Sequence, residues 1–196
     1  MLTVYLIRHT EVAVEKGLCY GGSDVALATN YPEQRNRVLA QLHARPDVVF
    51  SSPLSRCRRL AEDLAHNAPQ LAVAYDERLR EYQFGNWELT PWSDIPRDDL
   101  DAWMADFVHQ APHGGDSFLT LYDRVTAFWA ERVLPLADAN VPGTVYVVAH
   151  GGVIRALLCL FLDVPLQNAY RLHLDYGAVS RLVIQNQTYT VTYINR

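Results

Sequence analysis

The stretch TVYVVAHGGVIRALLCLFL, residues 144–162, contains the pattern that decides the fold. Thr144 to Ala149 is a short run of β-branched and apolar residues, which predicts a buried strand. Val153 to Leu162 has apolar residues at helical spacing, and only the tripeptide 150–152, His-Gly-Gly, separates the two segments. The sequence therefore predicts a strand that turns directly into a helix.

Runs of the same two kinds continue on both sides of this stretch. Alternation of strands and helices implies a three-layer αβα sandwich, in which helices cover both faces of a mainly parallel sheet of about six strands. The last two runs, joined through residues 185–187, are expected to form a hairpin at one edge. The further predicted strands are Leu2 to Ile7, Asp47 to Phe50, Leu71 to Tyr75, Val179 to Ile184 and Tyr189 to Tyr193, and the further helices are Pro32 to Ala44, Leu54 to Asn67 and Ser117 to Ala137.

We expect one domain over residues 1–196, because a chain of 196 residues can close one sizeable core. Residues 88–115 are rich in tryptophan, proline and aspartate, and no strand or helix is predicted there. A long segment of this kind inside a compact domain is typically functional. We interpret it as an inserted lid or cap.

The formal net charge of −5 limits the partners that the protein is expected to bind. Surfaces for nucleic acid or anionic membranes need an excess of basic residues, so neither partner is expected. A small phosphorylated substrate remains compatible, since a pocket can be locally positive. Assembly into a homo-oligomer stays open, because exposed apolar patches cannot be identified from the sequence.

Cysteine usage and the N-terminus indicate a cytoplasmic protein. Cys19, Cys57 and Cys159 are widely spaced, which fits neither a disulfide framework nor a zinc cluster, and we expect buried or incidental thiols. The first residues lack a positively charged region ahead of their apolar run. No uncharged apolar run reaches membrane-spanning length.

Polar residues follow three of the predicted strands at the points where the strands end. They are Arg8-His9, the run SSPLSR at 51–56 and the His-Gly-Gly tripeptide 150–152. Ligands of parallel sheets bind beyond the carboxyl ends of the strands, so two histidines and two arginines are expected to meet there. Guanidinium groups match phosphate oxygens, and amides at a helix N-terminus point at anions. The constellation predicts a phosphate site.

Other ways of handling phosphate each lack an essential part in this sequence. There is no G-x-x-x-x-G-K-[ST] loop and no G-x-S-x-G elbow. Cys57 does not begin an arginine-closed anion loop, and Asp99 and Asp101 lie in the polar insert instead of at a strand end. The seven histidines lack H-x-H or H-E-x-x-H spacing, so neither a metal nor another cofactor is expected. A histidine nucleophile remains.

Four separate blocks of the sequence together resemble the histidine phosphatase superfamily, also described as phosphoglycerate mutase-like. The blocks occur in the family's order, and the match spans nearly the whole chain. Within the superfamily, FGNWE at 84–88 and PHGGDSF at 112–118 resemble the α-ribazole phosphatases of cobalamin nucleotide-loop assembly. The four blocks are RH at 8–9, SSPLSR at 51–56, REYQFGNWE at 80–88 and HGG at 150–152.

The resemblance implies a two-step mechanism in which His9 is phosphorylated and then hydrolysed. Glu81 is the implied acid and base, which protonates the leaving group and later activates water. Positive groups stabilise the oxygens of a transferring phosphoryl group, and we expect the phosphate dianion to push His150 toward its charged form. The residues implied to hold phosphate are Arg8, Arg56, His150 and Gly151.

Some of these residues have alternative roles, and two positions depart from the family pattern. Glu81 could form a surface salt bridge with Arg78 or Arg80 instead, and Glu88 is expected to be structural. Thr10 stands where the family usually has glycine, and Glu15 stands where it often has an asparagine that binds phosphate. Tyr20 and Trp92 are the candidates for stacking on a planar group of the substrate, and packing is the alternative for such aromatic residues.

The sequence therefore predicts a cytoplasmic phosphomonoester phosphatase, with α-ribazole 5′-phosphate as its substrate. One alternative is a phosphoglycerate mutase or a broad sugar-phosphate phosphatase of the same superfamily. Mutases of the family commonly place arginine after the acid/base glutamate, where this chain has Tyr82, which favours hydrolysis. The other alternative is an inactive scaffold that binds a phosphorylated ligand without turnover.

Overall fold

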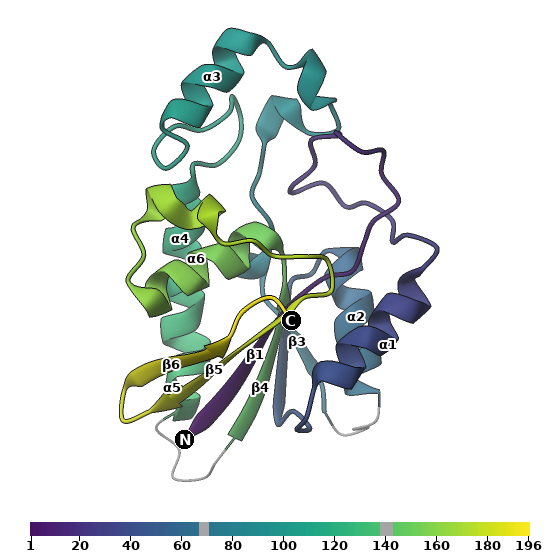
Figure 1. Cartoon of the computed structure of the whole chain (residues 1–196), viewed down its shortest axis with the longest axis vertical. Helices are drawn as coiled ribbons and strands as arrows, with labels where there is room; N and C mark the ends of the chain where they lie inside the picture. Colours follow the sequence, from purple (N-terminus) through teal and green to yellow (C-terminus); the bar gives the residue numbers. More distant parts are fainter. Residues whose placement is uncertain (67–70, 138–142) are drawn as a thin grey trace.

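A six-stranded mixed sheet forms the centre of the computed structural model, which describes residues 1–66, 71–137 and 143–196 (Figure 1). The strands are β1 (Leu2–Arg8), β2 (Val48–Ser51), β3 (Val73–Tyr75), β4 (Gly143–Ala149), β5 (Val179–Gln185) and β6 (Thr188–Tyr193). Their order across the sheet is β3-β2-β4-β1-β5-β6. The first four in this order are parallel, whereas β5 runs antiparallel to both β1 and β6.

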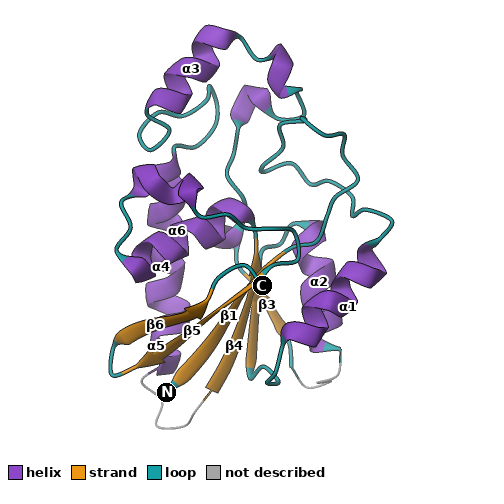
Figure 2. Cartoon of the chain, viewed as in Figure 1, coloured by secondary structure: helices purple, strands orange, loops and turns teal. Residues whose placement is uncertain are grey.

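Helices cover both faces of the sheet (Figure 2). The α-helices are α1 (Tyr31–Gln41), α2 (Ser55–Ala65), α3 (Arg97–Ala105), α4 (Phe118–Phe128), α5 (Leu134–Ala137) and α6 (Gly151–Leu162). The short elements are the 3₁₀ turns η1 (Glu77–Leu79), η2 (Gly85–Trp87), η3 (Trp92–Asp94) and η5 (Leu166–Arg171), and the π-helical turn η4 (Trp129–Val133). Within the described ranges, none of the helices has the length and apolar character needed to cross a membrane.

The two faces of the sheet belong to two separate parts of the core. Val4 and Leu6 of β1 point to the face covered by α4 and α6, and they belong to the larger apolar cluster. Tyr5 and Ile7 point to the opposite face, where they pack with buried residues of α1 and α2. Both faces of β1 are therefore buried, which explains why its sequence is a continuous apolar run instead of an alternating one.

The predicted three-layer α/β architecture is confirmed, and each of the six predicted strands lies within two residues of its expected bounds. The hairpin between β5 and β6 also forms, with Asn186 and Gln187 at φ 49° and 61°. Positive φ at both central residues is the geometry of the two-residue turns that match strand twist. The predicted helix ending at Asn67 extends beyond the described residues.

Two helical segments differ from the prediction. The expected single helix over 117–137 is interrupted by η4, which comes just before Pro135. Proline has no N–H and its ring clashes with the carbonyl four residues earlier, so a regular ladder cannot continue through this point. In the insert, α3 was not predicted, because it is short and only Leu100 and Trp103, both partly buried, pack against the core, which makes its apolar pattern brief.

The carboxyl ends of the parallel strands meet at one edge of the sheet. Residues 8, 51 and 149 are the last of β1, β2 and β4, and β5 begins at this same edge because it runs in the opposite direction. Figure 1 shows α3 beyond this edge, at the end of the molecule far from the N-terminus. The segment before α3 pairs with an early loop, since Leu18 forms a β-bridge with Pro91.

Candidate active site

His9 follows β1 and is fixed by its own backbone. Its N–H donates to Ala149 O at 3.0 Å, and its carbonyl accepts from Gly177 N at 3.0 Å. The imidazole is buried, and Nδ1 lies 2.7 Å from Thr10 O. A carbonyl oxygen only accepts, so Nδ1 carries the hydrogen and the lone pair of the neutral ring is on Nε2. The ring is thus oriented with an unprotonated nitrogen that can attack an electrophile.

The surroundings of His9 keep this ring neutral. Burial lowers its pKa well below 6.5, and the positive charges of Arg56 and Arg8 lower it further. The hydrogen bond to Thr10 O acts in the opposite direction but does not outweigh them. A neutral imidazole is the form that can act as a nucleophile.

Arg8 and Arg56 flank His9 and are held by backbone carbonyls. Arg8 Nη1 donates to Leu174 O at 2.5 Å. Arg56 lies in the first turn of α2 and has no exposed surface. Its Nη1 donates to Ser23 O at 2.7 Å and its Nη2 to Gly21 O at 2.6 Å. Both guanidinium groups keep further N–H groups, because each of them has five.

His150 lies below the two arginines at the N-terminus of α6. Its Nδ1 accepts a hydrogen bond from Arg56 Nε at 3.2 Å, and its Nε2 lies 2.8 Å from Ser52 Oγ. The rings of His9 and His150 are 5.1 Å apart between centroids. An Nδ1 that accepts a bond from a guanidinium cannot carry a proton, so the ring is neutral with its hydrogen on Nε2.

The cationic form of His150 is expected only beside a phosphate dianion, so that expectation stays a prediction. Burial lowers its pKa well below 6.5, and the positive charges of Arg56 and Arg8 act in the same direction. The Arg56 guanidinium that donates to the ring disfavours its charged form, whereas a phosphate dianion would favour that form.

Glu81 reaches the same edge from the segment after η1. Its Oε2 accepts from Gly152 N at 3.0 Å, at the N-terminus of α6, and its Oε1 accepts from Tyr82 N at 3.0 Å. A Cβ atom on Gly152 would lie 2.4 Å from Glu81 Oε1, so glycine is needed for this approach. The alternative salt bridge is not observed in the described part of the chain, where Arg78 pairs with Asp76 and Glu131 and Arg80 pairs with Glu77.

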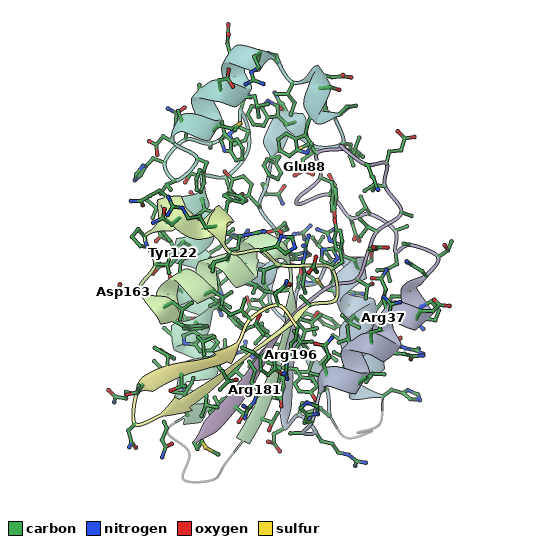
Figure 3. All side chains as sticks on the ribbon, viewed as in Figure 1. Arg37, Glu88, Tyr122, Asp163, Arg181 and Arg196 are labelled. Carbon is green, nitrogen blue, oxygen red and sulfur yellow. The ribbon has the colours of Figure 1, made fainter. Side chains whose placement is uncertain are left out.

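Glu88 has a structural position, as the sequence analysis expected (Figure 3). Its carboxylate accepts from the backbone N–H groups of residues 21–23, from Ser23 Oγ and from Phe84 N, at 2.6 to 3.1 Å. Burial alone would raise its pKa, but these hydrogen bonds outweigh burial and lower it. Glu88 thus fixes the loop whose carbonyls bind Arg56.

A pocket of about 530 Å³ opens at this edge of the sheet. It brings together six of the predicted site residues, whereas His150 and Gly151 lie beneath it and are not among its lining residues. The six are Arg8, His9, Tyr20, Arg56, Glu81 and Trp92, and the other lining residues are Glu11, Val12, Val14, Glu15, Lys16, Gly17, Leu18 and Tyr176. Among the described residues, no three His, Cys, Asp or Glu side chains are grouped so that they could hold a metal ion.

Tyr176, like Glu11 and Lys16, lines the pocket but was not predicted from the sequence. Its ring lies 4.0 Å from the Arg8 guanidinium carbon and 5.6 Å from the His9 ring centroid. Its hydroxyl is hydrogen-bonded to that of Tyr20, across the pocket. The predicted residues follow strands, whereas Tyr176 precedes β5, which starts at this edge because it is antiparallel. The direction of β5 was the missing information.

Comparison with known proteins identifies the family to which this geometry belongs. Residues 4–196 match the histidine phosphatase superfamily (branch 1). The chain therefore belongs to this superfamily, and it is a phosphatase.

Similar proteins carry the names of phosphatases for different substrates. A protein of Hydrogenobacter thermophilus, provisionally named phosphoserine phosphatase 2, is 30% identical over 100% of this chain and 96% of its own. The adenosylcobalamin/α-ribazole phosphatase of Escherichia coli K12 is 28% identical over 99% of this chain and 96% of its own. The crystal structure of the α-ribazole phosphatase from Shigella flexneri superposes with a TM-score of 0.86 at 27% identity, covering 99% of this chain and 96% of that one.

The buried histidines predict how stability depends on pH. Burial lowers the pKa of both His9 and His150, so the unfolded chain binds more protons than the folded one below about pH 6.5. Their contribution to the free energy of unfolding is therefore fully present above about pH 6.5. It falls as the pH decreases, by up to about 1.4 kcal/mol per pH unit for each histidine. Urea unfolding of His150→Asn between pH 7.5 and 5.5, in phosphate-free buffer, should show a shallower dependence on pH than the wild type.

The exposed His43 provides the control for this experiment. His43→Asn should keep the pH dependence of the wild type. The account of the buried neutral pair is contradicted if His150→Asn and the wild type lose the same free energy of unfolding over this pH range.

Proposed function

We propose that this phosphatase hydrolyses α-ribazole 5′-phosphate through a phosphohistidine at His9. The observation that carries the proposal is the composition of the pocket. Its lining combines Arg8, His9 and Arg56 with the rings of Tyr20, Trp92 and Tyr176 and the carboxylates of Glu11 and Glu15. The rings and the carboxylates suit an uncharged leaving group that carries a planar ring.

In the first step, His9 Nε2 attacks phosphorus and the bond from phosphorus to the ester oxygen breaks. The leaving alkoxide takes a proton from Glu81, which lies in the pocket wall. In the second step, water attacks phosphorus, Glu81 takes a proton from that water, and the bond between phosphorus and Nε2 breaks. The products are inorganic phosphate, the alcohol and the original enzyme, with Glu81 protonated as at the start.

The charge that develops on the phosphoryl oxygens needs donors on several sides. We assign this role to Arg8, Arg56, His150 and the amide of Gly151. Arg8 Nε is buried and has no hydrogen-bond partner in the described part of the chain, so it is available to a phosphoryl oxygen. For His150 to contribute, its Nε2–H must exchange Ser52 Oγ, 2.8 Å away, for a phosphoryl oxygen, while the Gly151 amide contributes from the N-terminus of α6.

The carboxylates at the pocket rim disfavour substrates that carry a second anionic group. Glu11 accepts from the neutral amides of Gln34 and Asn30 at 2.8 and 2.9 Å, so its charge is not neutralised by these contacts. Lys16 is the one cation among the outer lining residues. Phosphoserine and phosphoglycerate bring a carboxylate toward this rim, whereas α-ribazole phosphate does not, which favours the latter by Coulomb repulsion.

The mutase alternative is weakened by the position of Tyr82. This residue stands where family mutases have arginine, and it is buried with its hydroxyl accepting from Trp103 Nε1 at 3.1 Å. It is not among the lining residues of the pocket, so it offers nothing to a substrate carboxylate.

We further propose that residues 88–115 serve as a cap of a single domain. The cap supplies Trp92 to the pocket wall, and Trp92 N donates to Gly17 O at 2.8 Å. This bond and the bridge between Leu18 and Pro91 join the cap to the loop that follows His9. The two segments thereby form the outer part of the pocket together.

A panel of phosphate esters tests the proposed reaction. The enzyme should release phosphate with EDTA present, and His9→Ala should release none. Its kcat/KM should be highest for α-ribazole 5′-phosphate. The panel includes phosphoserine, 3-phosphoglycerate and glucose 6-phosphate. Faster release from one of these would contradict the substrate assignment, and binding of inorganic phosphate without turnover of any ester would favour the scaffold alternative.

Substitution of Glu15 tests the charge argument separately. Glu15→Gln removes one negative charge from the rim and should raise kcat/KM for phosphoserine relative to α-ribazole phosphate by about fivefold, which corresponds to about 1 kcal/mol. Glu33→Gln makes the same change on the exposed start of α1, outside the pocket, and should leave the ratio unchanged. An equal ratio in the wild type and Glu15→Gln would contradict the proposed discrimination.

A further inference from the structure

Arg124 lies on α4, outside the pocket lining, and it binds the backbone that carries Glu81. Its Nη1 donates to Arg78 O and to Arg80 O, both at 2.7 Å, and its Nη2 donates to Glu81 O at 3.0 Å. One guanidinium therefore satisfies three carbonyls within four consecutive residues.

Two of the three carbonyls that Arg124 binds lie in an irregular segment. Arg80 and Glu81 belong to residues 80–84, between η1 and η2, which form neither a helix nor a strand, whereas Arg78 lies in η1. Backbone carbonyls in such a segment need partners when they are buried. A planar guanidinium with a fixed fan of five donors sets the relative positions of the carbonyls that it binds, which an ammonium group cannot do in the same way.

The burial and the charged partners of Arg124 also indicate that its main interactions are with these carbonyls. Burial lowers its pKa, and the charges of Asp116 and Glu81 partly compensate. The approach to Asp116 is long, at 3.8 Å between Nη2 and Oδ2. A half-buried cation with one distant carboxylate partner depends mainly on its three carbonyl acceptors, so its interaction energy is concentrated on the Glu81 segment.

We propose that Arg124 is a positioning residue for the acid/base carboxyl of Glu81. Arg124 fixes the main chain of residue 81, and the Gly152 amide fixes the end of its side chain, so the carboxyl is held from both ends. The inference rests on the proposed acid/base role of Glu81. Arg124 does not touch the substrate and acts only through the geometry of this carboxyl.

Comparison of esters with different leaving groups distinguishes a positioning role from a merely structural one, because a structural defect would lower activity on all esters alike. p-Nitrophenolate leaves without needing a proton, whereas the alkoxide of β-glycerol phosphate needs one, so loss of general acid catalysis affects mainly the second ester. The quantity to compare is kcat/KM, because it covers the steps up to transfer onto His9 and excludes hydrolysis of the intermediate.

Arg124→Gln should lose about tenfold more kcat/KM on β-glycerol phosphate than on p-nitrophenyl phosphate, and Arg124→Lys should show a smaller split in the same direction. In a Glu81→Gln background, the split caused by Arg124→Gln should disappear, because the two residues act as one unit. Inhibition by inorganic phosphate should stay within about twofold of the wild type in both Arg124 variants, as expected for an intact phosphate site.

Arg132 provides the matched control. It lies on η4 directly after α4, pairs with Asp76 at 3.8 Å and is 45% exposed in its side chain. Arg132→Gln also removes one positive charge close to α4. It should leave the ratio of kcat/KM on β-glycerol phosphate to kcat/KM on p-nitrophenyl phosphate unchanged.

The outcomes separate this inference from the proposed function. Equal losses on the two esters in both Arg124 variants, or effects additive with Glu81→Gln, would overturn the positioning role. If Glu81→Gln itself showed no split between the esters, the proposed acid/base role of Glu81 would fail instead.

Discussion

The Arg56 guanidinium is a positive charge with no exposed surface, held where β2 and β4 end. A buried charge is costly unless polar groups replace the water that it loses. Here the backbone carbonyls of the loop 21–23 and the imidazole of His150 provide that replacement. The same loop is held through its N–H groups by the carboxylate of Glu88, so the cation and the anion stabilise each other across a short piece of backbone.

This arrangement accounts for the protonation of both histidines. A fixed cation beside buried imidazoles favours their neutral forms, and the hydrogen bonds then assign the tautomers: the hydrogen is on Nδ1 in His9 and on Nε2 in His150. His9 thus offers a lone pair, whereas the Nε2 hydrogen of His150 is directed at Ser52 Oγ. The site does not need to reorganise its charges before an anion arrives, which is the condition for electrostatic preorganisation.

The sequence predicted the sheet well because its signals are local. Continuous apolar runs mark β1 and β4, which are covered on both faces, and turn residues mark their ends. Arg8, His9 and Arg56 were found because they follow strands that the pattern could locate, whereas Glu81 came only from the resemblance to the family. By contrast, α3 packs against the core only through the partly buried Leu100 and Trp103, so its periodic signal is short.

Other residues of the site depend on long-range geometry that periodicity does not encode. Tyr176 enters the pocket because β5 is antiparallel to β1, and the sequence could not give that direction. Arg124 contacts a segment 43 to 46 residues away along the chain. The neutral form of His150 follows from one contact with Arg56, across 94 residues, and only the folded structure shows it.

The tautomer of His9 is the most direct test of the account. Phosphoenzyme trapped by rapid acid-free denaturation during turnover can be digested and its phosphohistidine examined by ³¹P NMR, which distinguishes the two ring positions. With Nδ1 hydrogen-bonded to Thr10 O, the account predicts phosphate on Nε2 of His9 alone. Phosphate on Nδ1 of His9, or on His150, would contradict it.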